Sequence, residues 1–484
     1  MSLKQTILSA IGWSVGIKLA FQIVNWGMTL VVIRMLSPDD YGLMAESQIF
    51  VNFLLGFGLL GLGDALVQQS DTPKAVVARV FGVLLLTSVG LTVLLMMAAY
   101  PIADWYSDRR LVPLIQVVSL GFMFNGLTAL PRAYLTKSLQ VRSILIIDLS
   151  SGFVGAAMVV VLAYNGYGVW ALVLGNLLSH VIGLLGFVTL CWKYYVWPRF
   201  DFVGLRPLFA FGIYRTFEYT VWVTYVSADV LIISRWLGPT ALGVYAVALN
   251  FATVPLSKIA PIVNATAFPA FAMVQARPAE ARFYALKALR MMATIAVPVF
   301  FGVCATAPEV VDLVFGPKWV EAKSVLGVLA LATTFRAILI VFPNYLQGIG
   351  DSQAGFWCTA TGAVIFPPAF VIGCQWGIEG VAYAWLIGYP VVFAINALIA
   401  SRRAGLDFSA LMLAPIRPIV AGVIMIAAVT AVRLVLPDGL PRIGYFAMLV
   451  AVGAATYCVV LFSLFRNLAM EMLRVVYRTP SPAG

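Results

Sequence analysis

Two long apolar segments of the sequence carry polar and charged side chains on one face. In residues 8–36, a helical spacing relates Ser14, Lys18, Gln22, Asn25 and Thr29. In residues 208–237, a similar spacing relates Arg215, Glu218, Trp222, Tyr225 and Asp229. Side chains at these spacings share one side of a helix. Lipid offers them no hydrogen bonds, so both faces are expected to line a cavity or to contact a neighbouring helix.

Basic residues lie within or at the ends of such apolar segments. They are Lys18, Arg34, Arg215, Arg235, Lys258 and Arg336. A charge at the bilayer centre costs ~2.5–3.5 kcal/mol, so several uncompensated charges would oppose insertion. A water-filled cavity removes most of that cost. We therefore predict that these residues line a cavity together with Gln22 and Asn25.

Structural roles are an alternative for some of these side chains. Arg34 and Arg235 can instead extend to the membrane interface. Arg215 can pair with Glu218, three residues later, or anchor the cytoplasmic end of its helix. Lys18 lies about ten residues into its segment, where reaching the interface is harder, and this favours a cavity position.

The composition requires lipid as the solvent for most of the chain. Of 484 residues, 62% are hydrophobic and 11% are charged, whereas soluble domains carry roughly 25% charged residues. A helix needs about 20 apolar residues to cross the hydrocarbon core. We therefore predict an all-α polytopic membrane protein with about fourteen transmembrane helices. The apolar runs are 8–36, 41–68, 76–101, 111–133, 144–164, 168–192, 208–237, 240–274, 284–307, 322–347, 354–374, 379–400, 411–435 and 443–466.

The net charge of +11 is explained by membrane topology rather than by nucleic acid. With the N-terminus inside, nineteen of the 31 Lys and Arg residues fall in cytoplasmic segments and six in the opposite loops. Cytoplasmic loops characteristically carry such an excess. We therefore expect both termini in the cytoplasm, anionic headgroups of membrane lipids as neighbours and no nucleic-acid partner.

The sequence offers little for metal, histidine or ATP chemistry. His180 is its one histidine, and its five cysteines form no C-x-x-C pair. These residues favour neither a metal site nor histidine-based catalysis, and we predict no catalytic residue. A Walker A motif is also missing, so ATP is not expected to be hydrolysed in this chain. No cofactor is predicted.

A sequence repeat divides the chain into two related parts. Residues 34–42 (RMLSPDDYG) recur at 235–243 (RWLGPTALG), with Arg, Leu, Pro and Gly at an offset of 201. Similar offsets relate 134–135 to 345–346 and 168–169 to 380–381. We predict two pseudo-symmetric six-helix lobes, residues 1–200 and 201–403, followed by two C-terminal helices and a cytoplasmic tail in 404–484. Six is even, so the lobes form a parallel repeat with a substrate cavity between them; chance recurrence of Pro-Gly turns is the alternative.

Several segments resemble a known transporter family. They are IGWSVGIKLAFQIVNWGMTLVVIRMLSPDDYGL, GLGDALVQQSD, ALPRAYLTKSLQVRSI, GYGVWALVLGNLL and FGIYRTFEYTVWVTYVSADVLIISRWLGPTALGVYAVA. Over at least residues 1–400, the chain is similar to the Wzx-type polysaccharide flippases of the multidrug/oligosaccharidyl-lipid/polysaccharide (MOP) exporter superfamily. The branch it resembles most serves colanic-acid and xanthan-type exopolysaccharides.

The resemblance implies a transporter rather than an enzyme. Its substrate would be an oligosaccharide repeat unit on undecaprenyl pyrophosphate, moved by alternating access from the cytoplasmic to the periplasmic leaflet of the bacterial inner membrane. Related flippases bind the pyrophosphate or acidic sugars through cationic cavity residues, and the six basic residues named above are at matching places. Such charges offset the desolvation of phosphate. A polysaccharide polymerase and export machinery are further expected partners.

The energy source is open between a coupled ion, H⁺ or Na⁺, and consumption of the flipped product. One charge crossing ~100 mV contributes ~2.3 kcal/mol. The candidate ion sites are Glu218, Asp229, Asp148 and Glu46. Asp229 lies close to the expected outer interface, where a solvated helix end or a cap is the alternative.

Three other functions compete with this prediction. A lipid II flippase shares the fourteen-span plan. A cation-coupled multidrug exporter of the same superfamily usually has twelve spans and an acidic first lobe, whereas this chain has Lys18 in its first segment. A membrane polymerase or ligase carries a large periplasmic loop, whereas the largest outer loops here, near 101–110 and 307–321, are short.

Overall fold

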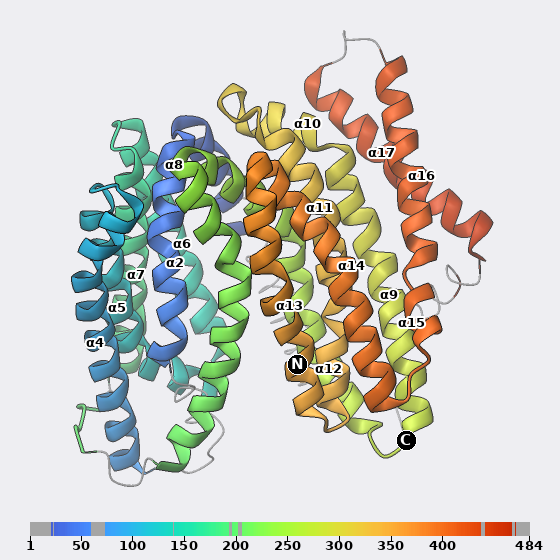
Figure 1. Ribbon diagram of the computed structural model, residues 1–484. Helices are drawn as coiled ribbons and strands as arrows, with labels where there is room; N and C mark the ends of the chain where they lie inside the picture. The colour runs from blue at the N-terminus through green and yellow to red at the C-terminus, as the bar shows by residue number, and fades with distance from the viewer. Residues whose placement is uncertain are drawn as a thin grey trace, which may run out of the picture. The chain divides into compact units, whose positions relative to one another are not determined.

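The computed structural model describes residues 21–22, 24–59, 73–138, 140–192, 196–201, 206–436, 441–466 and 470; for 56–59, 141 and 206–218 it describes the backbone alone. Helices account for nearly all of these residues, and no strand occurs among them. The chain divides into two compact units, Met1–Gly243 and Val244–Gly484. Figure 1 shows the helices of both units, coloured along the chain.

The first unit is built mainly from long helices. They are the helix Val24–Met35, α2 (Pro38–Leu59), α4 (Lys74–Tyr106), α5 (Leu111–Lys137), α6 (Val141–Tyr164), α7 (Val169–Cys191) and the part of α8 (Arg206–Met273) up to residue 243. α4 packs along α5, and α6 packs along α7. Apolar side chains such as Leu95, Ile115 and Phe122 are buried among them and form a core that holds α2 in place.

A glycine interrupts α8. Gly238 has φ +83° and ψ 175°, which is not helical, so residues 206–273 form two helices in succession. Glycine adopts positive φ without the steric cost that a Cβ imposes. The apolar runs 208–237 and 240–274 predict a boundary between two spans at this point.

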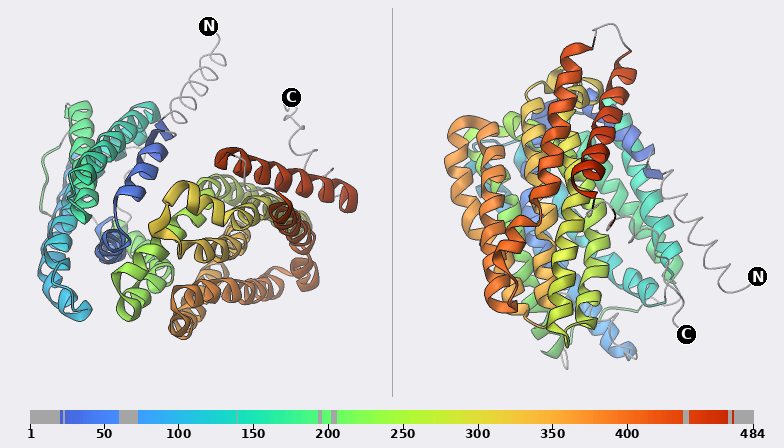
Figure 2. Two further views of the ribbon diagram at one scale, coloured as in Figure 1. Left: turned by 90° about the horizontal axis from the view of Figure 1, so that it is seen from above. Right: turned by 90° about the vertical axis from the view of Figure 1, so that its right-hand side faces the viewer.

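The second unit is a bundle of further helices. They are the remainder of α8, α9 (Pro278–Ala305), α10 (Ala307–Val310), the π-helical turn Val311–Phe315, the 3₁₀ turn Pro317–Trp319, α11 (Ala322–Leu339), α12 (Val341–Gly348), α13 (Ser352–Gly373), the 3₁₀ turn Cys374–Trp376, α14 (Gly377–Ala404), α15 (Phe408–Leu413), α16 (Ile416–Val435) and α17 (Arg442–Leu464). In Figure 2, α16 and α17 lie beside one another at the red end of the chain. Several aromatic side chains of α13 and α14 pack against one another. A hydrogen bond fixes this cluster: the Trp385 indole donates to the Tyr245 hydroxyl at 2.8 Å.

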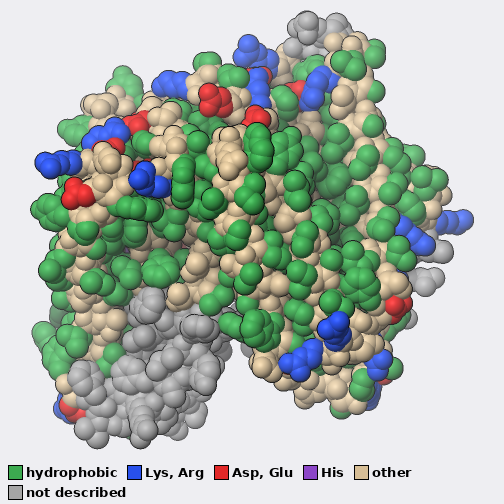
Figure 3. Space-filling model, in the orientation of Figure 1, with side chains coloured by type: hydrophobic (Ala, Val, Ile, Leu, Met, Phe, Trp, Pro, Cys, Tyr) green, Lys and Arg blue, Asp and Glu red, His purple; other side chains and the backbone are tan. Residues whose placement is uncertain are grey.

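The helices are long and apolar enough for a multi-pass membrane protein. Among the described residues, ten segments meet that description, and two of them, Tyr219–Met273 and Ser352–Ala404, have 55 and 53 residues. At 1.5 Å per residue, each is about 80 Å of helix, enough to cross a ~30 Å core twice. Figure 3 shows a face on which hydrophobic side chains prevail, with charged side chains gathered mainly toward its top and bottom. The count of fourteen spans and the lobe boundaries stay predictions.

Candidate functional site

The two copies of the sequence repeat meet in the first unit. Gly42, in the first turns of α2, lies against the carbonyl of Pro239, and Gly243 in α8 lies against the carbonyl of Pro38. A Cβ added to either glycine would overlap that backbone carbonyl. The contact is therefore reciprocal and depends on the absence of a side chain. In the sequence these residues indicated a repeat, and their common offset of 201 gave no sign that the two copies touch.

Beyond this crossing lies a buried carboxyl group on α2. Glu46 is 2% exposed, and the hydroxyl of Ser234, on α8, donates to its Oε1 at 2.5 Å. Among the residues that the structure describes, the buried Oε2 has no hydrogen-bond partner, and the same holds for the hydroxyl of Tyr106 at the end of α4. Tyr106 lies close enough to interact with both Ser234 and Glu46. The structure thus brings a carboxyl and two hydroxyl groups together where water is excluded.

A second buried carboxyl lies on α8, in the turns before Ser234. Asp229 is fully buried, and its Oδ1 accepts a hydrogen bond from the amide of Val230 at 2.7 Å. It precedes Ser234 by five residues, about 7.5 Å along the helix axis. Two of the four predicted ion-site residues, Glu46 and Asp229, are therefore buried in the first unit.

The other two predicted acidic residues differ in setting. Asp148 on α6 forms an ion pair with Arg132 on α5 at 2.5 Å, and both side chains are partly exposed. Its charge is therefore already compensated by a neighbouring helix. Glu218 lies on α8, and its side chain is outside the described residues.

The predicted cationic residues fall in both units. Arg235 follows Ser234, is exposed, and places its guanidinium 5.9 Å from the ring centroid of Trp105. Arg34 and Lys258 are exposed, and Arg336 on α11 is half-buried. Gln22 is half-buried and Asn25 is exposed, near the start of the described chain. Lys18 and the side chain of Arg215 lie outside the described residues.

A charged cluster outside the spanning helices fixes the turn between α4 and α5 onto α2. The Arg110 guanidinium lies 2.7 Å from the carboxylate oxygens of both Asp108 and Asp39. The hydrogen bond from Arg110 holds the pKa of the Asp108 carboxyl below its usual value, and the two carboxylates raise the pKa of Arg110. This cluster ties the repeat segment that contains Gly42 to the rest of the unit.

The Asp108→Asn variant is expected to melt at a lower temperature at neutral pH. The loss in free energy of unfolding should be at most about 1 kcal/mol, because the ion pair is exposed. Because folding depresses the pKa of Asp108, its contribution is present above the unfolded value of about 4 and is lost as pH falls through the folded value. The difference between variant and wild type should therefore shrink below about pH 4. Thermal melting at several pH values measures this, and the exposed Asp104→Asn serves as the control; an undiminished difference in acid would contradict the prediction.

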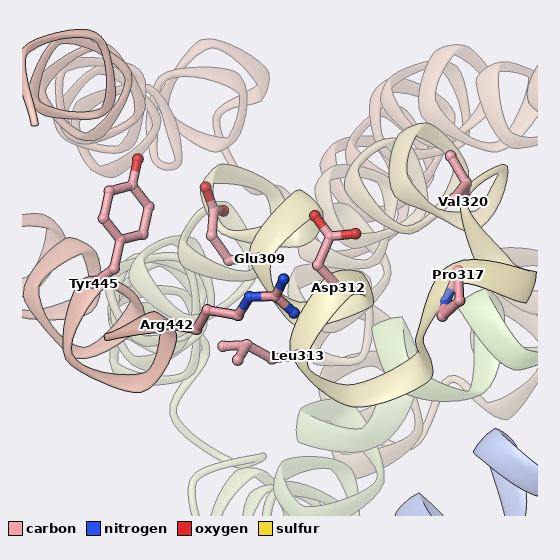
Figure 4. Close-up of a pocket in the computed structure, with 7 residues that line it drawn as sticks. All are labelled: Glu309, Asp312, Leu313, Pro317, Val320, Arg442 and Tyr445. Carbon is pink, nitrogen blue, oxygen red and sulfur yellow. The ribbon is translucent and has the colours of Figure 1, made fainter. Parts of the chain in front are cut away.

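A pocket of about 660 Å³ in the second unit has three charged residues in its lining, none of which was a candidate from the sequence. In Figure 4, Arg442 at the start of α17 extends toward Glu309 and Asp312. Glu309 is already paired with Arg433, and Asp312 with Lys323, each at 2.8 Å. These two ion pairs join α10 to α16 and the π-helical turn Val311–Phe315 to α11.

Within the part of the chain that the structure describes, no group of three or more His, Cys, Asp or Glu residues is placed to hold a metal ion. The long apolar helices define a polytopic membrane protein. The chain belongs to the family described as "Polysaccharide biosynthesis protein", which it matches over residues 31–324. The predicted kinship with proteins of polysaccharide biosynthesis is thereby confirmed.

Similar proteins are transporters and flippases rather than enzymes. The chain is 27% identical to the succinoglycan biosynthesis transport protein ExoT of Rhizobium meliloti, over 99% of this chain and 98% of ExoT. It is 25% identical to the lipopolysaccharide biosynthesis protein WzxC of Escherichia coli, over 83% and 81% of the two chains. The solved lipid II flippase MurJ, in an inward closed conformation, shares the fold with a TM-score of 0.71 and 11% identity, covering 93% of this chain and 99% of MurJ.

Proposed function

We propose that the protein flips undecaprenyl-pyrophosphate-linked oligosaccharide repeat units from the cytoplasmic to the periplasmic leaflet of the bacterial inner membrane, for exopolysaccharide biosynthesis. The observation that carries the proposal is the family match over residues 31–324, together with similarity to a succinoglycan transport protein along almost the whole chain. A polysaccharide polymerase and export machinery would take up the flipped unit, and both termini would lie in the cytoplasm.

The mechanism we propose is alternating access through a cationic central cavity. Lys18, Arg34, Arg215, Arg235, Lys258 and Arg336 would contact the pyrophosphate or acidic sugars, assisted by Gln22 and Asn25. Basic side chains offset the desolvation of phosphate, while the lipid tail stays in the bilayer. Several distributed contacts also permit release, which one tight site would not.

We further propose that the coupling ion is H⁺ and that Glu46 carries it. An unpaired carboxylate is costly to bury, and a proton on the unpartnered Oε2 removes that cost. The groups facing this carboxyl are Ser234 and Tyr106, with Asp39, Asp108 and Arg110 acting from the adjacent turn. Na⁺ requires several oxygen ligands, whereas Glu46 accepts one hydroxyl hydrogen bond here. Asp229 is the second proposed ion site, and Glu218 and Asp148 remain candidates from the sequence.

The test is complementation of a strain that lacks the gene, with the lipid-linked repeat unit assayed separately in each leaflet. Lys18→Ala and Arg215→Ala should strand the unit on the cytoplasmic side at normal protein level. A hydrogen bond to a charged group contributes about 1.5–3 kcal/mol, so transport should fall by about tenfold or more. Lys74→Ala, which removes an exposed lysine at the start of α4, is the matched control.

The outcome separates the competing transporters. The fold shared with MurJ favours a lipid II flippase as the second candidate, and accumulation of lipid II in the deletion strain would replace the proposal with it. Normal export without the gene, with increased sensitivity to cationic dyes, would instead indicate a cation-coupled multidrug exporter.

A further inference from the structure

A groove in the second unit runs along the pair of helices α13 and α14. Its volume is about 500 Å³, and its walls are almost entirely apolar, with Val364 and Ile365 on α13 and Ile395 and Ile399 on α14. Val364 is 71% exposed and Trp357, which also lines the groove, is 53% exposed. An apolar groove on spanning helices that is open along its side suits a hydrocarbon chain.

The length of the groove matches one leaflet. On α13 it extends from Ala354 to Ile365, a rise of about 16 Å along the helix axis. Half of a ~30 Å hydrocarbon core is ~15 Å. A chain lying in the groove would therefore reach from one membrane interface to the bilayer midplane.

One end of the groove is basic. Arg402 and Arg403, in the last turn of α14, line it there. Arg403 donates to the Gln353 side chain at 3.1 Å and lies 3.7 Å from the Asp351 carboxylate. Arg402 is exposed, and the part of the chain that the structure describes gives it no hydrogen bond or ion pair. Two guanidinium groups against one carboxylate leave one positive charge at the mouth of an apolar channel.

We propose that this groove binds an anionic glycerophospholipid of the cytoplasmic leaflet, with an acyl chain between α13 and α14 and the headgroup phosphate on Arg402 and Arg403. Basic pockets between helices on the cytoplasmic side bind anionic headgroups, and the guanidinium fork matches phosphate oxygens. Trp357, less than one helical turn from Ala354, lies at the depth where tryptophan rings favour the interface. A polyprenyl carrier is much longer than one leaflet, so the groove length favours a phospholipid.

Native mass spectrometry of the purified full chain, titrated in parallel with phosphatidylglycerol, phosphatidylcholine and undecaprenyl phosphate, tests the proposal. Phosphatidylglycerol should be retained at least about fivefold better than phosphatidylcholine. This factor corresponds to about 1 kcal/mol, the contribution of one basic residue near the membrane surface. The double variant Arg402→Gln/Arg403→Gln should lose that preference. Arg417→Gln, an exposed arginine at the start of α16 outside the groove, should keep it.

A second measurement locates the lipid. Phosphatidylglycerol brominated on its acyl chains should quench part of the tryptophan fluorescence, and that part should be missing in Trp357→Phe. Equal retention of the two phospholipids, an unchanged preference in the double variant, quenching that does not depend on Trp357, or retention of undecaprenyl phosphate in place of phosphatidylglycerol would each overturn the proposal. None of these outcomes alters the leaflet assay on which the proposed function depends.

Discussion

The Glu46→Gln variant is expected to fold normally and to lose most of its ability to accumulate flipped substrate. Glutamine keeps an oxygen that accepts from Ser234, but it cannot bind and release a proton. One proton crossing ~100 mV contributes ~2.3 kcal/mol, which corresponds to a factor of about 50 in accumulation. Transport in proteoliposomes with and without an imposed proton gradient measures the loss directly.

Two comparisons make the Glu46 result interpretable. Glu321→Gln changes an exposed carboxyl before α11 and should behave as wild type. Ser234→Ala removes only the hydroxyl donor, at a cost of about 1 kcal/mol, and should keep proton coupling. Full accumulation by Glu46→Gln, or transport driven equally by a sodium gradient, would show that Glu46 is not the proton site.

Adding a single methyl group at Gly42 or Gly243 is expected to be among the most disruptive small substitutions in the first unit. The Cβ of Gly42→Ala would overlap the carbonyl of Pro239, and that of Gly243→Ala the carbonyl of Pro38. Both obstacles are backbone atoms, so α2 and α8 must separate. Overpacking costs about 1–3 kcal/mol, and the melting temperature of either variant should fall by several degrees.

The reciprocity of the crossing gives this prediction a further test. Once one alanine has separated the two segments, the second should cost less, so the double variant should be less destabilised than the sum of the single variants. Gly90→Ala, in α4 with no atom near the added Cβ, should leave stability unchanged or raise it by about 0.5–1 kcal/mol. Wild-type melting of Gly42→Ala would contradict the contact.

The sequence predicted the membrane-spanning class, the family and a helix boundary near Gly238, because these depend on local composition and turn chemistry. It could not predict the environment of Glu46, because the partner Ser234 is 188 residues away and only the packing of α8 on α2 brings them together. The same limitation applies to Asp148: the sequence made it a candidate ion site, whereas the structure pairs its carboxylate with Arg132 on a neighbouring helix.

The repeat shows a different limit. Matching letters at 34–42 and 235–243 indicated two related segments, and turn chemistry explained Pro and Gly within each segment. Neither argument indicates that the glycine of one copy packs on the proline of the other. That contact depends on how α2 and α8 pack against each other. The spacing of residues within one helix carries no information about this packing.

The crossing also has the form of an isologous interface. Gly42 touches Pro239, and the counterparts of these two residues in the other copies, Gly243 and Pro38, touch each other. The same exchange of contacts occurs in a dimer with a two-fold axis. Two identical subunits would have to carry every substitution on both sides of such an axis. Joined in one chain, the copies differ: Asp39 and Asp40 correspond to Thr240 and Ala241, and Asp39 pairs with Arg110. Because both copies belong to one chain, the two glycine–proline contacts stay symmetric while the acidic residues are confined to the first copy, residues 34–42.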